Sequence, residues 1–83
     1  MKTYIALIRK DEDSDYGVDF PDFPGCITAG STLGEARDLA VEALTDHIEE
    51  MRGTGHEIPR PSTFHTVMAD PHNRGVDAIL VTV

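Results

Sequence analysis

Three aspartates at alternate positions, Asp11, Asp13 and Asp15, have the spacing with which a calcium-binding loop of the EF-hand type begins. Such a loop also needs a glycine at its sixth position, for a sharp turn, and a bidentate glutamate at its twelfth. Here those positions hold Tyr16 and Asp22, and the flanking residues favour strands over helices. The three aspartates therefore indicate a solvated hairpin tip, and we expect no metal site there.

One cysteine and four histidines are the other side chains that could serve as zinc ligands, or as a nucleophile with its base. The histidines are His47, His56, His65 and His72. No two of them are four residues apart, and only Cys26 could join them as a ligand. A histidine could activate the thiolate of Cys26, but this residue stands beside Ile27 in a predicted strand, where a half-buried thiol is ordinarily inert. We therefore predict no catalytic residue, no metal and no cofactor.

The charge of the chain indicates which partners it suits. Fifteen acidic residues against seven basic ones give a formal net charge of −8, the wrong sign for neutralising phosphates. Direct binding to nucleic acid is disfavoured, and a basic partner is favoured because complementary potentials steer encounter. An acidic surface that only maintains solubility is the alternative.

The size of the chain predicts a single domain over residues 1–83, with one hydrophobic core. So small a domain is marginally stable alone, and one cysteine cannot form an intrachain disulfide, so we expect a homodimer or tetramer. Strand-like sequence begins at once and leaves no room for a secretory signal. The longest apolar run is about five residues, far below the ~20 that span a bilayer, so we expect a cytoplasmic protein.

The N-terminal third has the composition of strands. Residues 3–8 are β-branched and apolar, and residues 16–20 alternate apolar with small or polar side chains. Residues 21–25 contain two prolines and a glycine and must turn the chain before a third strand at residues 26–30. Because the connections are short, these strands form an antiparallel meander.

A long amphipathic helix is predicted over residues 33–52. Thr32 and Glu35 form a capping box, in which the hydroxyl accepts from the Glu35 N–H and the carboxylate reaches back to the Thr32 N–H. Apolar residues then recur at steps of three and four, at Ala36, Leu39, Ala40, Ala43, Leu44, Ile48 and Met51. Gly53 or Gly55 is expected to end the helix.

The C-terminal third predicts an extended connector, a short helix and a last strand. Residues 58–62 form the connector, and Ser62 is the expected cap of a helix over residues 63–69. Residues 76–83 form the strand, whose apolar run predicts burial on both faces. The helical crossover predicts that this strand lies parallel to a neighbour. The fold class is α+β: a three-stranded antiparallel meander, a long helix, a short helix and a fourth strand.

The same order of elements occurs in the core of ribonuclease H-like folds, in which carboxylates hold Mg²⁺ against a phosphate. Asp19 and Asp22 are the only acids near the middle of the predicted sheet, and their neighbours are prolines and phenylalanines. One chain therefore does not supply a two-metal site. A metal-dependent nuclease and a stand-alone oligomeric regulatory module are the alternatives to a protein-binding function.

Three linked motifs carry a resemblance to a known family. They read FPDFPGC at residues 20–26, G-x-T-xx-EA at residues 30–36 and G-xx-IP-x-PS at residues 55–62. With these motifs in order over essentially its whole length, the chain resembles the HicB antitoxins. The residues that define the pattern are Phe20, Pro21, Phe23, Pro24, Gly25, Thr32, Glu35, Pro59 and Pro61.

The resemblance implies a partial ribonuclease H-like fold without the nuclease site. It also implies an antitoxin that neutralises a HicA-type toxin, a small basic ribonuclease that cuts messenger RNA with a histidine, by occluding the toxin's RNA-binding and catalytic face. Many family members continue into a DNA-binding domain. This chain stops at Val83, on the predicted last strand, so promoter binding is not carried over.

The candidate contacts to basic toxin residues are Asp19, Asp22, Glu49 and Glu50. A solvated acidic surface is the alternative for these four, because an exposed ion pair contributes only about 0–1 kcal/mol. For the aromatic and proline residues of the turn, packing within the fold is favoured over contact with the partner.

Overall fold

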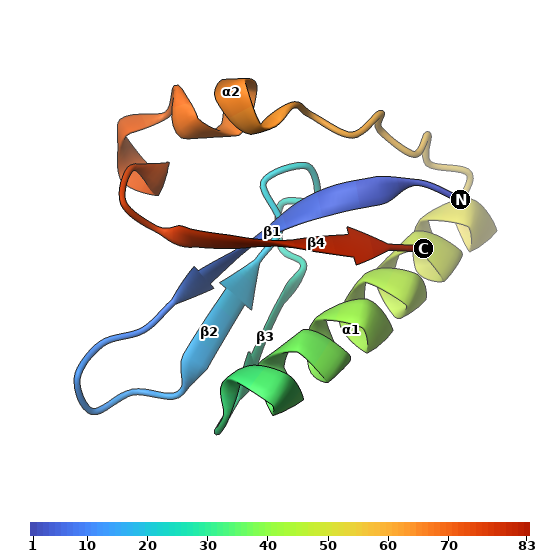
Figure 1. Ribbon diagram of the computed structural model, residues 1–83. Helices are drawn as coiled ribbons and strands as arrows, with labels where there is room; N and C mark the ends of the chain where they lie inside the picture. The colour runs from blue at the N-terminus through green and yellow to red at the C-terminus, as the bar shows by residue number, and fades with distance from the viewer.

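The computed structural model describes residues 1–83 as one four-stranded sheet with a long helix and two short ones (Figure 1). In chain order the elements are β1 (Thr3–Arg9), β2 (Tyr16–Asp19), β3 (Ile27–Gly30), α1 (Leu33–Gly53), α2 (Phe64–Met68), the 3-10 helix η1 (Pro71–Asn73) and β4 (Asp77–Thr82). The strand order is β3-β2-β1-β4, and every neighbouring pair is antiparallel. The α+β fold class and the meander are confirmed, whereas the predicted parallel strand is wrong.

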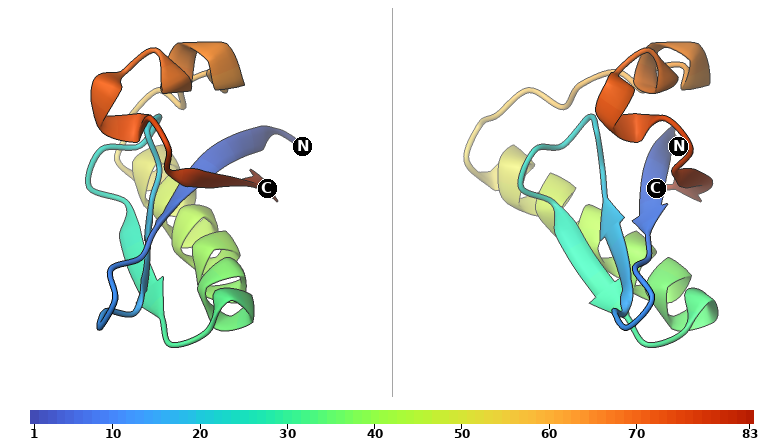
Figure 2. Two further views of the ribbon diagram at one scale, coloured as in Figure 1. Left: turned by 60° about the vertical axis from the view of Figure 1, so that its left-hand side comes forward. Right: turned by 90° about the vertical axis from the view of Figure 1, so that its left-hand side faces the viewer.

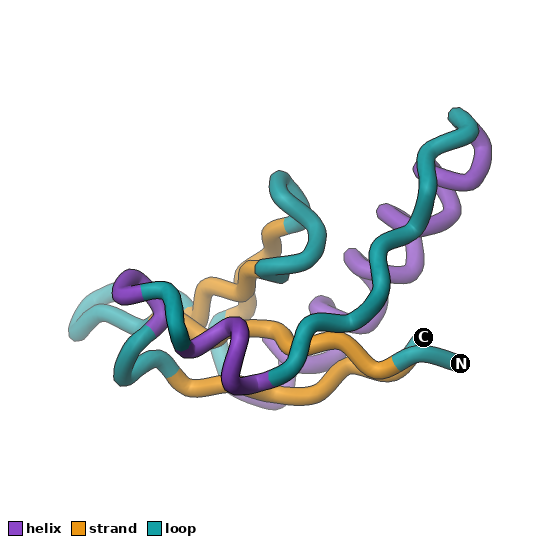
Figure 3. The backbone as a smooth tube through the Cα atoms, turned by 90° about the horizontal axis from the view of Figure 1, so that it is seen from above, coloured by secondary structure: helices purple, strands orange, loops and turns teal.

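The path of the chain after α1 explains why β4 is antiparallel to β1. A helix that led directly into the last strand would have made it parallel to β3, and therefore to β1. Instead, residues 54–76 run back along the sheet through α2 and η1 before β4 begins (Figure 3). This second pass reverses the direction once more. It places α2 and η1 at one end of the molecule and the β1–β2 loop at the other (Figure 2).

β1, and not β4, is the strand that is buried on both faces. Alternate side chains point to opposite faces of a strand. Tyr4, Ala6 and Ile8 lie in the core cluster that includes the buried stripe of α1, whereas Ile5 and Leu7 cluster on the other face. In β4 only Val81 is buried, and Leu80 is 70% exposed. The predicted two-sided burial of the last strand is therefore wrong, because β4 lies at the edge of the sheet.

The long helix begins and packs as predicted, with one difference at its cap. The Glu35 N–H donates to Thr32 Oγ1 at 3.0 Å, as in a capping box. The Glu35 carboxylate accepts from the Ser31 N–H at 3.2 Å, however, and not from Thr32. Gly53 remains helical, and Gly55 follows the end of the helix with φ +79°. The buried residues of α1 are Ala36, Ala40, Leu44 and Ile48, all on the predicted apolar stripe.

The short helix is present, but the predicted cap was wrong. Thr63 caps α2, and its hydroxyl accepts from the Thr66 N–H at 3.1 Å. Ser62 instead directs both its N–H and its hydroxyl at Asp22. Val67 is the buried residue of α2 and covers the second face of β1. None of the helices has the length and apolarity needed to cross a membrane.

The end of β3 touches the first turn of α1 so closely that only glycine fits. A Cβ on Gly30 would lie 2.5 Å from the backbone nitrogen of Ala36 and 2.8 Å from its Cα. These are backbone atoms, so the strand and the helix would have to separate. A Cβ on Gly34, inside the first turn of the same helix, would meet nothing within 4 Å.

We therefore expect Gly30→Ala and Gly34→Ala to have opposite effects on stability. Gly30→Ala should lower the free energy of unfolding by about 1–3 kcal/mol, since it overpacks a backbone contact. Gly34→Ala should raise it by up to about 1 kcal/mol, because alanine is the better helix former. Urea unfolding followed by circular dichroism measures both values. Equal effects of the two substitutions would contradict the close contact.

Candidate partner-binding surface

The turn between β2 and β3 consists of two consecutive hydrogen-bonded turns. The Phe23 N–H donates to the Phe20 carbonyl oxygen and the Cys26 N–H to the Phe23 carbonyl oxygen, both at 3.0 Å. In the second turn Pro24 is followed by Gly25, whose φ is +89°. Proline and then a left-handed residue is the requirement of a type II turn. The proline and glycine of this motif are therefore explained by backbone geometry.

Phe23, 1% exposed, anchors this turn in the core. Its ring meets the ring of Tyr4 edge-on, with centroids 4.8 Å apart, and the ring of His47 on α1, with centroids 5.8 Å apart. The Tyr4 hydroxyl donates to the Pro59 carbonyl oxygen at 2.6 Å. Burial, and next the charge of Asp22, raise the pKa of Tyr4, so its hydroxyl stays a donor. One aromatic side chain thus joins the turn to β1 and α1, and through Tyr4 to the connector.

Asp22 fastens the same turn to the connector a second time. Its carboxylate accepts from the Ser62 N–H at 2.9 Å and from the Ser62 hydroxyl at 2.5 Å. Two motifs that lie 40 residues apart in sequence are therefore tied directly. Asp22 is half-buried and has a structural partner within the chain.

Asp19 is also engaged within the chain. One carboxylate oxygen lies 2.6 Å from Nε of Arg9, in the single ion pair of the structure. The same guanidinium donates to Asn73 Oδ1 at 2.9 Å and to the His72 carbonyl oxygen at 3.2 Å. The buried Asn73 in turn donates to the Val67 carbonyl oxygen at 3.0 Å. Asp19 therefore helps to hold η1 against β1 and β2, with the hydrogen bond to Asp19 raising the pKa of Arg9.

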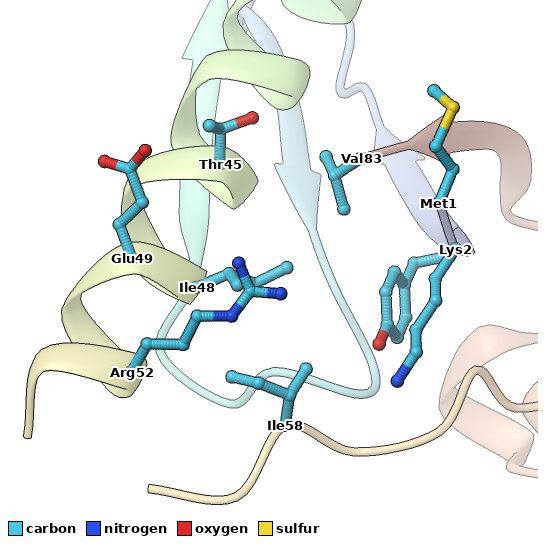
Figure 4. A pocket seen from close by; sticks show the side chains of 9 residues that line it. Met1, Lys2, Thr45, Ile48, Glu49, Arg52, Ile58 and Val83 are labelled. Carbon is cyan, nitrogen blue, oxygen red and sulfur yellow. The ribbon is translucent and has the colours of Figure 1, made fainter. Parts of the chain in front are cut away.

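Glu49 and Glu50, by contrast, are exposed on α1 and form no ion pair. Glu49 lies beside a cavity of about 260 Å³ between α1, the connector and the two chain ends. Figure 4 shows the guanidinium of Arg52 directed toward this space, while Glu49 points away from it. Glu50 lines a second cavity, of about 360 Å³, together with Asp22, His47 and His56. The structure thus brings Asp22 and Glu50 together and leaves Asp19 and Glu49 apart from them.

Three further acids belong with Glu49 and Glu50. At about 100° per residue, Asp38, Glu42 and Asp46 fall with Glu49 on the side of α1 opposite the buried stripe, and Glu50 lies at the flank of that side. All five acids are exposed. We call Asp38, Glu42, Asp46, Glu49 and Glu50 the acidic face of α1. Asp38, Glu42 and Asp46 follow one another at steps of four residues. This spacing was the sequence signal that could have identified these three acids.

Cys26 lies just before β3 and is 4% exposed. Burial raises the pKa of its thiol, which disfavours the reactive thiolate. No group of three or more histidine, cysteine, aspartate and glutamate side chains is arranged to hold a metal ion.

Comparison with known proteins assigns the family. The profile described as "HicB_like antitoxin of bacterial toxin-antitoxin system" matches residues 4–83. The chain belongs to the HicB-like antitoxin family. It is 36% identical over 80 residues to an uncharacterised 14.9 kDa protein of Haemophilus phage HP1, and 34% identical over 58 residues to antitoxin HicB 1 of Photorhabdus laumondii. These alignments cover 96% and 70% of this chain, and 59% and 37% of those proteins.

Solved structures of HicB proteins have the same fold. The crystal structure of the Burkholderia pseudomallei antitoxin HicB superposes with a TM-score of 0.89 at 32% identity, covering all of this chain and 64% of that one. A chain of a HicA3–HicB3 toxin–antitoxin complex matches with a TM-score of 0.78 at 30% identity, covering 96% of this chain and 95% of that one. The chain therefore spans less than two thirds of several HicB relatives and nearly the whole of the matched chain in the complex.

Within this HicB-like domain, most of the residues that carry the family resemblance have roles in folding. Phe20 and Phe23 are buried, Gly25 has the positive φ of its turn, and Pro59 supplies the acceptor for Tyr4. Thr32 caps α1, and Glu35 bonds the residue before the cap. Pro21 is half-buried, whereas Pro24 and Pro61 are exposed, and no contact of Pro61 explains its place in the motif.

The Asp22–Ser62 contact predicts a coupled pair. Asp22→Ala and Ser62→Ala should each lower the free energy of unfolding, by about 1–3 kcal/mol for loss of a hydrogen bond to a charged group. The double variant should lose less than the sum, because each substitution already removes the same contact. Glu50→Ala, at an exposed acid of the same cavity, should stay within about 0.5 kcal/mol. Additive losses in urea unfolding would contradict the pairing.

Burial of Cys26 predicts slow alkylation. At pH 8 the native thiol should react with iodoacetamide at least about tenfold more slowly than in the urea-unfolded chain, since it is covered and less ionised. The control is Ile27→Cys in a Cys26→Ala background: Ile27 is 71% exposed, so a thiol there should react almost as in the unfolded chain. A native Cys26 that reacts as fast as this control would contradict its burial.

Proposed function

We propose that this chain neutralises a HicA-type toxin by placing the acidic face of α1 over the toxin's basic RNA-binding and catalytic face. The observation that carries the proposal is the position of this face: five exposed acids lie outside the stripe with which α1 packs on the sheet, four of them opposite it and Glu50 at its flank. The membership of the family and the likeness to an antitoxin solved in a HicA3–HicB3 complex support the choice of partner.

The electrostatics favour rapid association with a basic protein. The net charge of −8 provides a long-range attraction, and complementary potentials raise association rates. Glu49 and Glu50 have no cationic partner within the chain, so their charge is available to a toxin. Occlusion then requires only that the antitoxin covers the surface through which messenger RNA would enter.

The four acids predicted from the sequence receive different roles in this proposal. Glu49 and Glu50 are proposed to contact the toxin directly. Asp22 adds negative charge to the cavity that it shares with Glu50, while its oxygens hold Ser62. Asp19 acts within the fold, where Arg9 already neutralises it.

We propose recognition without bond-making by the chain itself, in the cytoplasm, where the messenger RNA is. A ribonuclease H-like nuclease would need carboxylates free to bind Mg²⁺. Asp19 and Asp22, the two acids considered for that role, are each engaged by an internal partner. Incubation of the purified chain with Mg²⁺ and an RNA–DNA hybrid should give no cleavage, and cleavage that is lost in Asp19→Asn would refute the proposal.

Charge reversal on α1 provides the test of toxin binding. Glu49→Lys/Glu50→Lys should lower the association rate with the cognate toxin about tenfold or more, because it replaces attraction by repulsion at the contact. Glu12→Lys/Asp13→Lys makes the same change of net charge in the exposed β1–β2 loop and should change the rate less than about threefold. Stopped-flow association and toxin RNA cleavage measure the two effects. Equal losses in both variants would mean that only the net charge matters.

A further inference from the structure

The cavity of about 260 Å³ between α1, the connector and the two chain ends combines apolar walls with two cations. Three separate segments supply apolar side chains to it, those of Ile48, Ile58 and Val83. The cations are Lys2 and Arg52, which Figure 4 shows on opposite sides of the space. The guanidinium of Arg52 is directed into it. Positive charge and apolar surface therefore meet at one place in a chain that is acidic as a whole.

Neither cation is neutralised within the chain. The single ion pair of the structure involves neither Lys2 nor Arg52. Glu49 lies one turn before Arg52 but points away from the cavity (Figure 4). A basic residue in the last turn of a helix often bonds the last carbonyl groups. Here the carbonyl oxygens of residues 50–52 already accept from the backbone N–H groups of residues 54–56, so the guanidinium is not needed there.

Two unpaired cations that face one space favour an anion between them, because the anion removes their mutual repulsion. A guanidinium offers parallel N–H donors that suit the two oxygens of a carboxylate. The apolar walls require in addition that the carboxylate carries an apolar group. An apolar cavity of about 150 Å³ holds one benzene molecule. In the same proportion, the cavity of about 260 Å³ has room for roughly ten non-hydrogen atoms.

We propose that this cavity binds a free aliphatic monocarboxylate with the size of octanoate. The carboxylate lies between Arg52 and Lys2. The tail lies against Ile48, Ile58 and Val83. The inference does not rest on the proposed function, since it concerns the cationic cavity and not the acidic face of α1.

The surrounding charge favours a small ligand over an acidic macromolecule. The cavity adjoins the acidic face of α1, because Glu49 belongs to that face and also lines the cavity. An acidic peptide or a nucleic acid would bring many negative charges close to this face and would be repelled. A monocarboxylate brings one negative charge and places it between the two cations. The net charge of −8 opposes even this ligand at long range, so binding depends on the local cations and on burial of the tail.

Titration of the full chain, followed by heteronuclear NMR, tests the class of ligand. Octanoate should bind at least about tenfold more tightly than acetate, which lacks the tail, or octanamide, which lacks the charge. The largest shift changes should occur at the backbone amides of residues 48–52, 58 and 83. Inorganic phosphate, an anion without apolar surface, should bind no better than acetate.

Matched substitutions on α1 test the site. Arg52→Gln and Arg37→Gln each remove one positive charge from an exposed position of the same helix, and Arg37 does not line the cavity. Arg52→Gln should raise the dissociation constant of octanoate at least about tenfold, because the paired donors are lost. Arg37→Gln should change it less than about twofold, since a distant exposed charge is screened. Circular dichroism checks that both variants fold.

Four outcomes would overturn the proposal. These are no shift changes with millimolar octanoate, equal affinity for octanoate and octanamide, equal affinity for octanoate and acetate, or equal losses in the two variants. N-acetyl-leucine that binds more tightly than octanoate would also overturn it and would identify the C-terminal residue of a protein as the occupant. Every measurement uses the chain alone, so failure of toxin binding would leave the result unaffected.

Discussion

Burial of β1 on both faces is the constraint from which the other elements take their places. Tyr4, Ala6 and Ile8 pack in the α1 cluster on one face, while Ile5 and Leu7 pack with Val67 on the other. One strand thus requires two separate covers, and the chain supplies α1 first and α2 only after a long return along the sheet. The return sets the direction of β4, and β4 lies at the edge of the sheet because β2 occupies the other side of β1.

The turn after β2 is in contact with α1 and with the residue just before α2. Because these segments are distant in sequence, the family motifs that contact one another are also distant in sequence. Phe23 contacts Tyr4 of β1 and His47 of α1, and Asp22 holds Ser62 just before α2. A change in either motif would loosen the other, since they share the same contacts. Most of the residues by which the family is recognised therefore maintain the fold.

What could be predicted from the sequence depended on whether the signal was local. The cap and stripe of α1 were predicted correctly because Thr32, Glu35 and the apolar repeat act within one helix. The direction of β4 was predicted wrongly, since it depends on the path of residues 54–76, for which no short pattern exists. Its apolar run resembled that of β1, and only the strand order distinguishes a central strand from an edge.

The four candidate acids show the same limit. All four were chosen by charge, yet Asp19 and Asp22 are engaged by Arg9 and Ser62, which are distant in sequence, while Glu49 and Glu50 have no such partner. The sequence could not distinguish these pairs, because an acid that serves the fold and one that serves a partner have the same chemistry.

The architecture also places the charged surface, on α1, apart from the strand edge with free backbone groups, on β4. The acidic face of α1 would attract a basic partner through exposed carboxylates. Salt at 0.1 M limits the range of such an attraction to about 10 Å. The β4 edge offers hydrogen bonds and one leucine, which salt screens little. Because α1 covers a face of the sheet while β4 ends it, one small domain presents both kinds of surface without overlap. Raising the salt concentration should therefore weaken contacts of the acidic face of α1 with a basic partner.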